Sequence, residues 1–125
     1  MSNLTDVADV PVIDVWGEAV RARRIEGESI TLALIELAPD SIVPGHRHEN
    51  EQLGIVISGS LTFTVGDETR QLGPGGTWRI PSDTPHQVSV GPDGAVVIDV
   101  FAPIRTDWEN LPSHPPSRPI WPNGD

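Results

Sequence analysis

Residues 45 to 59 read GHRHENEQLGIVISG and place two of the four histidines of the chain one residue apart. Alternate side chains of an extended segment project from the same face, so the imidazoles of His46 and His48 would lie within reach of one ion. Gln52 has the same parity as both histidines, whereas Glu51 does not. The pattern therefore predicts a metal site that begins with His46, His48 and Gln52.

A further candidate ligand, His86, opens an expected strand directly after the segment IPSDTP, residues 80–85. Three neutral imidazoles and one amide oxygen suit a divalent transition metal and leave coordination positions for water or substrate. The alternative for each histidine is a packed or solvated side chain. The same-face pair strengthens the metal interpretation but leaves both alternatives open, and the spacing of the residues around the pair decides between them.

The residues around these histidines predict an all-β fold, because apolar residues recur with period two or in short runs that glycine and proline separate. The expected strands are ITLALIEL (30–37), LGIVIS (53–58), LTFTV (61–65), TWRI (77–80), HQVSV (86–90) and AVVIDVF (95–101). Gly59-Ser60 reads as a two-residue hairpin connection, and GDETR (66–70), LGPGG (72–76) and GPDG (91–94) read as turns. Evenly spaced short strands favour an antiparallel sandwich or barrel.

The length of 125 residues predicts one domain, and 37% hydrophobic residues suffice for one modest core. We expect residues 1–102 to form the barrel, N-terminal strands included, and residues 103–125 to form a proline-rich C-terminal extension. The extension has five prolines between residues 112 and 122. It is expected either to be disordered or to pack its large apolar groups, Trp108, Ile120 and Trp121, on the barrel or on a second subunit.

The charge of the chain limits its partners. A net charge of −10 and a pI near 4.6 argue against nucleic acid and anionic membranes, because polyanions would be repelled. The absence of cysteine excludes disulfides and thiolate metal sites. The N-terminus does not read as a signal peptide and no window has transmembrane length, so we expect a cytoplasmic protein.

Two spaced motifs resemble those of the cupin superfamily. The first comprises Gly45, His46, His48, Gln52 and Gly59, and the second lies in GGTWRIPSDTPH (75–86), with Gly75, Pro81 and His86 at the family's spacing. The resemblance implies a small jelly-roll (cupin) β-barrel with a metal inside one mouth. The implied ligands are His46, His48, Gln52 and His86, and zinc, nickel, manganese and iron all suit them. A homodimer is also implied, and the strand 95–101, apolar on both faces, needs such cover.

Three positions depart from the cupin pattern: Gln52 replaces the usual glutamate, Asp83 a glycine, and Val90 an asparagine. Aspartate visits left-handed backbone conformations more readily than most residues, so Asp83 is tolerable. An amide at position 52 leaves the full divalent charge to polarise a bound oxygen, which favours Lewis-acid work on an anionic or carbonyl-bearing substrate.

A narrower resemblance combines the first motif with IDVFAPIRTDW (98–108). These stretches are similar to single-domain cupins of the pectin-degradation type, which implies ring opening of unsaturated uronates, with Asp99 as acid/base and Arg105 as the contact for a substrate carboxylate. The alternative is a structural role for Asp99, bonded to Arg105 or to a turn amide, and an ordinary exposed position for Arg105.

Other functions stay open from the sequence. They are a metal-dependent dioxygenase, a small-cupin polyketide cyclase and a cupin that binds a small molecule without turnover. Phe63 and Trp78 would belong either to the core or to the pocket wall. Gly54, inside an expected strand, would mark a bulge or a close approach of substrate or backbone.

Overall fold

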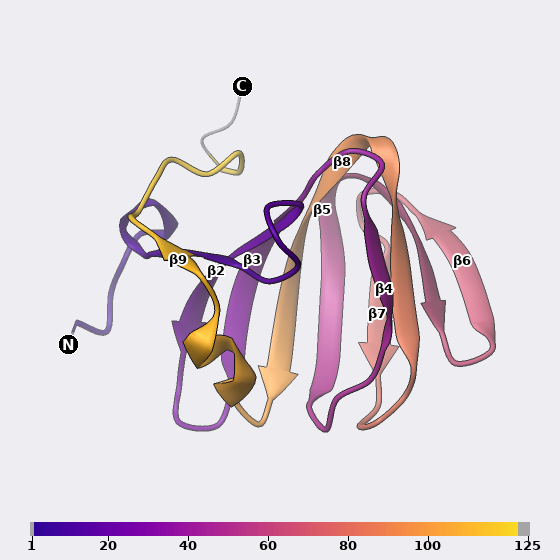
Figure 1. The fold of residues 1–125 in the computed structure, drawn as a ribbon, viewed down its shortest axis with the longest axis horizontal. Coiled ribbons are helices and arrows are strands. Elements are labelled where there is room, and N and C mark those ends of the chain that lie inside the picture. Colours follow the sequence, from indigo (N-terminus) through magenta and orange to yellow (C-terminus); the bar gives the residue numbers. More distant parts are fainter. Residues whose placement is uncertain (1, 123–125) are drawn as a thin grey trace.

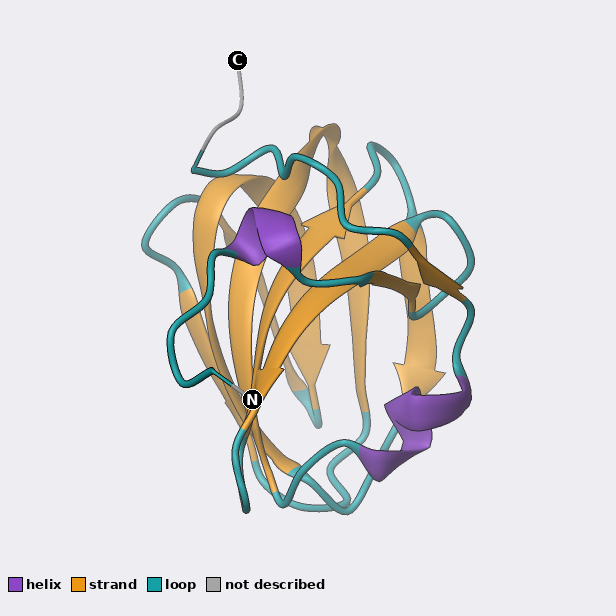
Figure 2. Ribbon diagram, turned by 90° about the vertical axis from the view of Figure 1, so that its left-hand side faces the viewer, coloured by secondary structure: helices purple, strands orange, loops and turns teal. Residues whose placement is uncertain are grey.

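The computed structural model describes residues 2–122, and its regular secondary structure is almost entirely β-strand (Figure 1). The strands are β1 (Val12–Asp14), β2 (Val20–Glu26), β3 (Thr31–Leu37), β4 (Ile42–His46), β5 (Glu51–Val65), β6 (Glu68–Leu72), β7 (Thr77–Ile80), β8 (His86–Ala102) and β9 (Ser113–His114). Two short 3-10 helices, η1 (Val7–Asp9) and η2 (Thr106–Asn110), lie outside the strand layers (Figure 2). No helix among the described residues has the length and apolar character that crossing a membrane requires.

The long strands β5 and β8 organise the fold. Their pairing runs from Glu51↔Ala102 to Val65↔His86, and both strands bend on the way. The second half of β8 also pairs with β3, which leads on through β2 and β1 to β9, whereas its first half pairs with β4. All strand pairings are antiparallel. The prediction of an all-β antiparallel barrel is confirmed.

The predicted hairpin at Gly59-Ser60 is wrong, because both residues lie inside the continuous strand β5. The register with β8 shifts between Val56 and Ser58 and again between Gly59 and Leu61, so the strand bends at bulges instead of reversing. Gly59 has φ +79°, and a Cβ there would collide with the carbonyl of Gly94. Only glycine fits this position.

Two predicted turns also change. GPDG (91–94) stays within β8, which crosses from one half of the barrel to the other at that point. The turn predicted at 66–70 is confined to Gly66-Asp67, and Glu68 already begins β6. In both places glycine supplies a bend, with φ +73° at Gly94 and +58° at Gly66.

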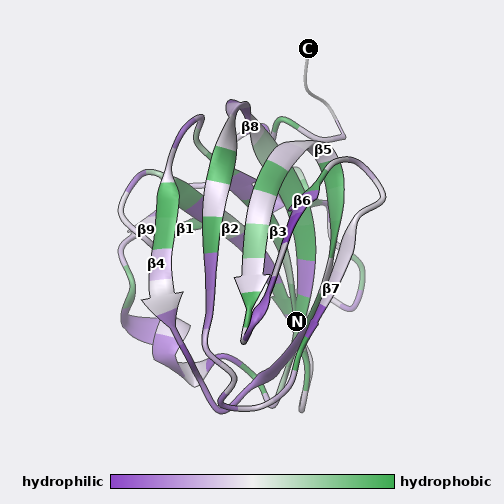
Figure 3. Ribbon diagram, turned by 90° about the vertical axis from the view of Figure 1, so that its right-hand side faces the viewer, coloured by the Kyte–Doolittle hydropathy of each residue, from purple (hydrophilic) through white to green (hydrophobic). Residues whose placement is uncertain are grey.

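The core fills the barrel from the inward faces of the strands. Hydrophobic positions alternate with paler or hydrophilic ones along the strands (Figure 3), as strands with one buried face require. Val56, Ile80 and Phe101 are at most 2% exposed. Burying a side chain of this kind stabilises the fold by about 1.5–3 kcal/mol.

The segment that follows β8 packs against the barrel over its described part, residues 103–122. Trp108 is buried, β9 pairs with β1, and Pro119 is fully buried. A guanidinium nitrogen of Arg23, Nη2, donates to the carbonyl of Ser117 at 3.2 Å. Of the three large apolar residues expected to pack on the barrel, Trp108 does so, whereas Ile120 and Trp121 are exposed. Residues 123–125 of the predicted extension lie outside the described residues.

Candidate metal centre and substrate pocket

Three histidines meet at one end of the barrel. His46 ends β4 and pairs with His86, the first residue of β8, and His48 follows β4 by two residues. The ring centroids of His46 and His86 are 4.2 Å apart, and those of His48 and His86 are 4.8 Å apart. Each ring offers a nitrogen that lies within 4.8 Å of the other two. The structure thus brings together the three histidines of the two motifs.

Backbone carbonyls fix the tautomer of all three rings. The Nδ1 atoms of His46, His48 and His86 lie 2.9, 3.0 and 2.8 Å from the carbonyl oxygens of Pro44, Asn50 and Thr84. A carbonyl can only accept, so Nδ1 carries the proton and Nε2 keeps its lone pair. Among the described residues, the buried Nε2 of His48 has no hydrogen-bond partner. A divalent metal bound to the three Nε2 atoms would satisfy this unpaired lone pair together with those of the other two rings. The three histidines therefore fit such an ion.

Burial keeps two of the rings neutral. It lowers the pKa of His86 to about 4. It also lowers the pKa of His48, and the positive charge of Arg105 adds to this effect. A metal-binding imidazole must be unprotonated, so the two rings are in the ligating form at neutral pH without help from an ion.

Gln52 lies on the inward face of β5, as its parity predicted, and is 7% exposed. Its amide nitrogen donates to Oδ1 of Asp99 at 2.9 Å, which fixes the orientation of the amide and leaves Oε1 free of that bond. The Gln52 side chain also raises the pKa of His48, against the larger lowering effect of burial. A glutamate here would set a second carboxylate against Asp99, whereas an amide can donate to Asp99 and still offer an oxygen.

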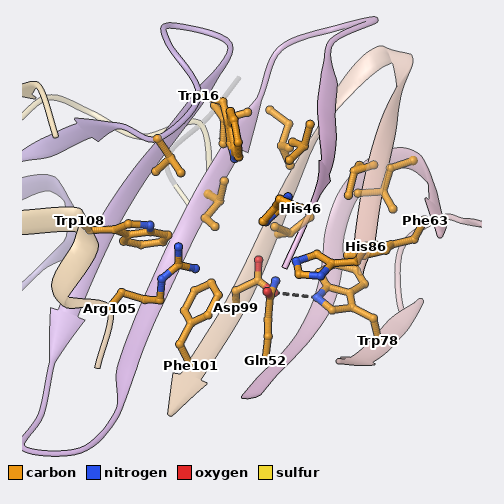
Figure 4. Close-up of a pocket in the computed structure, with 18 residues that line it drawn as sticks. Trp16, His46, Gln52, Phe63, Trp78, His86, Asp99, Phe101, Arg105 and Trp108 are labelled. Carbon is orange, nitrogen blue, oxygen red and sulfur yellow. Dashed lines mark hydrogen bonds between the residues drawn. The ribbon is translucent and has the colours of Figure 1, made fainter. Parts of the chain in front are cut away.

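Asp99 is a buried carboxylate, 4% exposed, whose Oδ1 accepts from Gln52 and also from the indole Nε1 of Trp78 at 2.7 Å (Figure 4). Burial raises its pKa to about 6, against the opposing effect of these hydrogen bonds and of Arg105. Its hydrogen-bond partners are thus Gln52 and Trp78, two side chains of the pocket wall, in place of the Arg105 or turn amide that the structural alternative named.

Gly54 makes room for this arrangement. It pairs with Asp99 on one side and with Trp78 on the other. A Cβ at this position would collide with Oδ1 of Asp99 and with the Trp78 indole. The register shows no bulge at Gly54, and two side chains approach it where substrate or backbone was predicted. The missing Cβ allows the hydrogen bond between them.

Arg105 is 7% exposed, so the predicted alternative of an ordinary exposed arginine is wrong. Its guanidinium carbon lies 4.7 Å from the ring centroids of both Phe101 and Trp108. Nε and Nη2 donate to the carboxylate of Asp107 at 3.0 and 2.8 Å. None of the hydrogen bonds among residues 2–122 uses Nη1. Figure 4 shows the guanidinium between the two rings and directed toward the pocket centre.

Two contacts that the sequence did not reveal hold the metal-binding segments in place. The backbone N–H of Asp83 donates to the carbonyl of His48 at 2.8 Å, and Asp83 has φ +58°, the left-handed conformation expected of it. Buried Asn50 donates through Nδ2 to the carbonyls of Pro103 at 2.6 Å and Ile104 at 3.2 Å. These bonds tie the histidine segment to the second motif and to the segment that carries Arg105.

Several of these groups line one pocket, whose empty space, counted out to the solvent at its mouth, is about 560 Å³. The chemically active side chains on its wall are His46, Gln52, His86, Asp99 and Arg105, and the aromatic ones are Trp16, Phe63, Trp78, Phe101 and Trp108. Phe63 and Trp78 belong both to the core and to the pocket wall. Sequence reasoning missed Trp16, whose one local signal is the glycine turn that follows it.

Comparisons with known proteins agree with this geometry. A family model described as a cupin domain matches residues 33–101. H2HPP isomerase of Bacillus subtilis is 32% identical over 93 residues, which cover 72% of this chain but 39% of that relative. The chain thus spans about two fifths of the length of the isomerase.

Pectin degradation protein KdgF of Dickeya dadantii (strain 3937) is 26% identical over 94 residues, which cover 74% of this chain and 86% of the relative. A solved RmlC-like cupin from Shewanella frigidimarina NCIMB 400 superimposes with a TM-score of 0.78 at 19% identity, covering 86% of this chain and 96% of the other. Since the family model spans more than half of the chain, and the barrel and both histidine motifs accompany it, the protein belongs to the cupin family.

Proposed function

We propose that this protein is a metal-dependent cupin enzyme that isomerises or ring-opens a small unsaturated sugar acid, with Asp99 as the acid/base. The observation that carries the proposal is the buried Asp99 carboxylate, which lines one pocket together with Arg105 and with His46 and His86, two of the three converging histidines. A carboxylate buried among apolar strands is costly unless it has a use.

The two carboxylate oxygens of Asp99 have different roles, since one accepts hydrogen bonds from the protein and the other is left for proton transfer. Oδ1 accepts two hydrogen bonds, from Gln52 and Trp78, whereas none of the hydrogen bonds within the described chain uses Oδ2. A proton on this carboxyl group would therefore reside on Oδ2. With a pKa raised by burial to about 6, the group can take a proton from a substrate carbon or hydroxyl and return it near neutral pH.

The residues proposed to hold the metal are His46, His48, His86 and the amide oxygen of Gln52. A divalent ion bound there would act as a Lewis acid on a substrate oxygen, with its full charge because all four ligands are neutral. Gln52 has a second task, since its amide nitrogen holds Asp99 in a fixed orientation beside the site.

Arg105 is the proposed contact for the carboxylate of the substrate. The chain contains no lysine, and Arg105 is the sole arginine among the described residues that line the pocket. The Phe101 and Trp108 rings and the Asp107 carboxylate hold its guanidinium in place, so little side-chain entropy is lost when Nη1 binds an anion.

The names of the relatives support this class of reaction. One relative is named as an isomerase and the other as a pectin degradation protein, which together favour isomerisation or ring opening of an acid released from pectin. The dioxygenase, the cyclase and the binding protein without turnover are the alternatives. A carboxylate placed for proton transfer favours the isomerase over the dioxygenase, because dioxygen binding does not require such a group.

The test loads the metal-depleted protein separately with zinc, nickel, manganese and iron and adds an unsaturated uronate prepared with a pectate lyase. We expect wild type to remove the conjugated chromophore without oxygen uptake. In Asp99→Asn the chromophore should persist. Oxygen uptake with a persistent chromophore would support the dioxygenase instead. Uronate binding without any product would support the binding protein.

We also propose that the protein forms a homodimer through an outer apolar row, defined as Ile25, Leu32, Val100 and Leu53. These residues are neighbours across β2, β3, β8 and β5. Ile25, Leu32 and Leu53 are 41%, 41% and 48% exposed, respectively. A continuous apolar row of this kind favours cover by a partner, and a second copy presents the same uncharged surface despite the acidic charge of the chain.

A further inference from the structure

Trp16 stands at the mouth of the pocket with part of its ring open to solvent. It is 40% exposed, whereas Phe63, Trp78, Phe101 and Trp108, the other aromatic residues of the pocket wall, are each at most 7% exposed. Its ring centroid lies 5.3 Å from that of His46, with the two planes tilted by 55°. In Figure 4, Trp16 lies on the far side of His46 from Asp99 and Gln52. Trp16 is thus the aromatic side chain that an entering molecule would meet first.

The turn that carries Trp16 is fixed from both sides. The N–H of Val15 donates to the carbonyl of Val20 at 2.8 Å and closes the loop between β1 and β2. Asp14, at the end of β1, accepts from Arg21 at 3.2 Å and bonds His114 of β9 at 2.8 Å. The indole therefore occupies its position before any ligand arrives, so binding a ligand costs little ordering entropy.

The conformation of Gly17 explains how the indole reaches the mouth. Gly17 has φ +61°, which residues with a side chain rarely adopt, and a Cβ there would meet no atom within 4 Å. The glycine therefore serves the turn and not a close packing contact. This tight turn carries Trp16 beside the histidine at the end of β4 instead of away into solvent.

Resting on the proposed function, we propose that Trp16 is a substrate-binding residue whose indole stacks on the face of the sugar-acid ring while Arg105 holds its carboxylate. The C–H groups on one face of a sugar ring are weakly positive and apolar, and they complement the negative face of an indole. No hydrogen bond among the described residues uses the indole N–H of Trp16, so it is available to a ring hydroxyl. Trp16 would bind the face of the ring and Arg105 its carboxylate, and together they would orient the ring over Asp99.

The test compares Trp16→Ala and Trp16→Phe with Trp121→Ala. Trp121 is a matched control because it is also 40% exposed and does not line the pocket. For the unsaturated uronate we expect KM to rise about tenfold in Trp16→Ala and about threefold in Trp16→Phe, with kcat nearly unchanged, because stacking stabilises ground state and transition state alike. Trp121→Ala should match wild type, and the metal content of all variants should be equal.

A binding measurement separates this inference from the proposed reaction. Calorimetric titration with glucuronate, a saturated uronic acid that lacks the reactive double bond, should show the same loss of affinity in Trp16→Ala. If wild type converts the uronate but Trp16→Ala keeps the wild-type KM and glucuronate affinity, the role of Trp16 is wrong and the proposed function stands. If wild type neither converts the unsaturated uronate nor binds glucuronate, both proposals fail.

Discussion

Replacing Asp99 with asparagine should make the metal-free protein more stable while it abolishes turnover. Asparagine keeps an Oδ1 that can accept from Gln52 and Trp78, and it removes a charge from a buried site. Burial raises the pKa of Asp99 from 3.8 to about 6, and this difference corresponds to a destabilisation of about 3 kcal/mol in the ionised state. The stabilisation of the variant should therefore approach about 3 kcal/mol at neutral pH.

The sign of the pH dependence follows from the same shift. Below pH 3.8 the carboxyl group is protonated in both folded and unfolded chains, so its ionisation costs the fold nothing. As pH rises from 3.8 to about 6 the unfolded chain ionises first, the cost grows, and above that window it is constant. The advantage of Asp99→Asn should accordingly be largest at neutral pH and shrink toward zero as the pH falls below 3.8.

Urea unfolding in the presence of a chelator, followed at several pH values across that window, measures the effect. Asp107→Asn is the control of opposite sign, because hydrogen bonds from Arg105 lower the pKa of Asp107 and the variant should lose stability at neutral pH. The reasoning is refuted if Asp99→Asn is no more stable than wild type at neutral pH, or if its gain does not change with pH.

Three further predictions concern the support of the site and its surroundings. Arg105→Lys should raise KM for the uronate roughly tenfold in steady-state kinetics, because lysine has no planar group to lie between Phe101 and Trp108; an unchanged KM would contradict this role. Gly54→Ala should destabilise the fold by about 1–3 kcal/mol in urea unfolding and reduce activity, because its Cβ would meet Asp99 and Trp78. Gly73→Ala is the control, because its Cβ would meet no atom within 4 Å, and it should change neither stability nor activity. Equal effects of the two substitutions would argue against the close approach at Gly54. Leu53→Lys should convert the proposed dimer to a monomer in size-exclusion chromatography with light scattering, and an unchanged mass in a dimeric wild type would exclude the outer apolar row as the interface.

The sequence predicts most of the strands, because period-two alternation and glycine-proline punctuation are local signals. It fails at Gly59-Ser60, where glycine suits a two-residue hairpin as well as a bulge in a continuous strand. The choice between them depends on β8, which offers partners on both sides of Gly59 in a segment some thirty-five residues away. No local pattern contains that information.

The candidate site likewise contains features that local sequence patterns predicted and features that depend on tertiary structure. Strand parity correctly placed Gln52 on the inward face, and the spacing of the two motifs indicated the three histidines that the fold brings together. The hydrogen bonds of Asp99 could not be predicted, because they depend on the register that sets Gly54 between Asp99 and Trp78. The burial of Arg105 also depends on tertiary structure, since Trp108 covers it only after η2 folds back onto Phe101.

Elemental analysis of the purified protein tests the central claim, that His46, His48 and His86 together hold a metal. We expect about one divalent transition metal per chain in wild type, and loss of the metal in His48→Gln and His86→Gln with the β-sheet circular dichroism retained. His114→Gln is the matched control, because His114 lies outside the histidine cluster and should leave the metal content unchanged. Wild-type protein that takes up no metal, or cluster variants that keep it, would contradict the account.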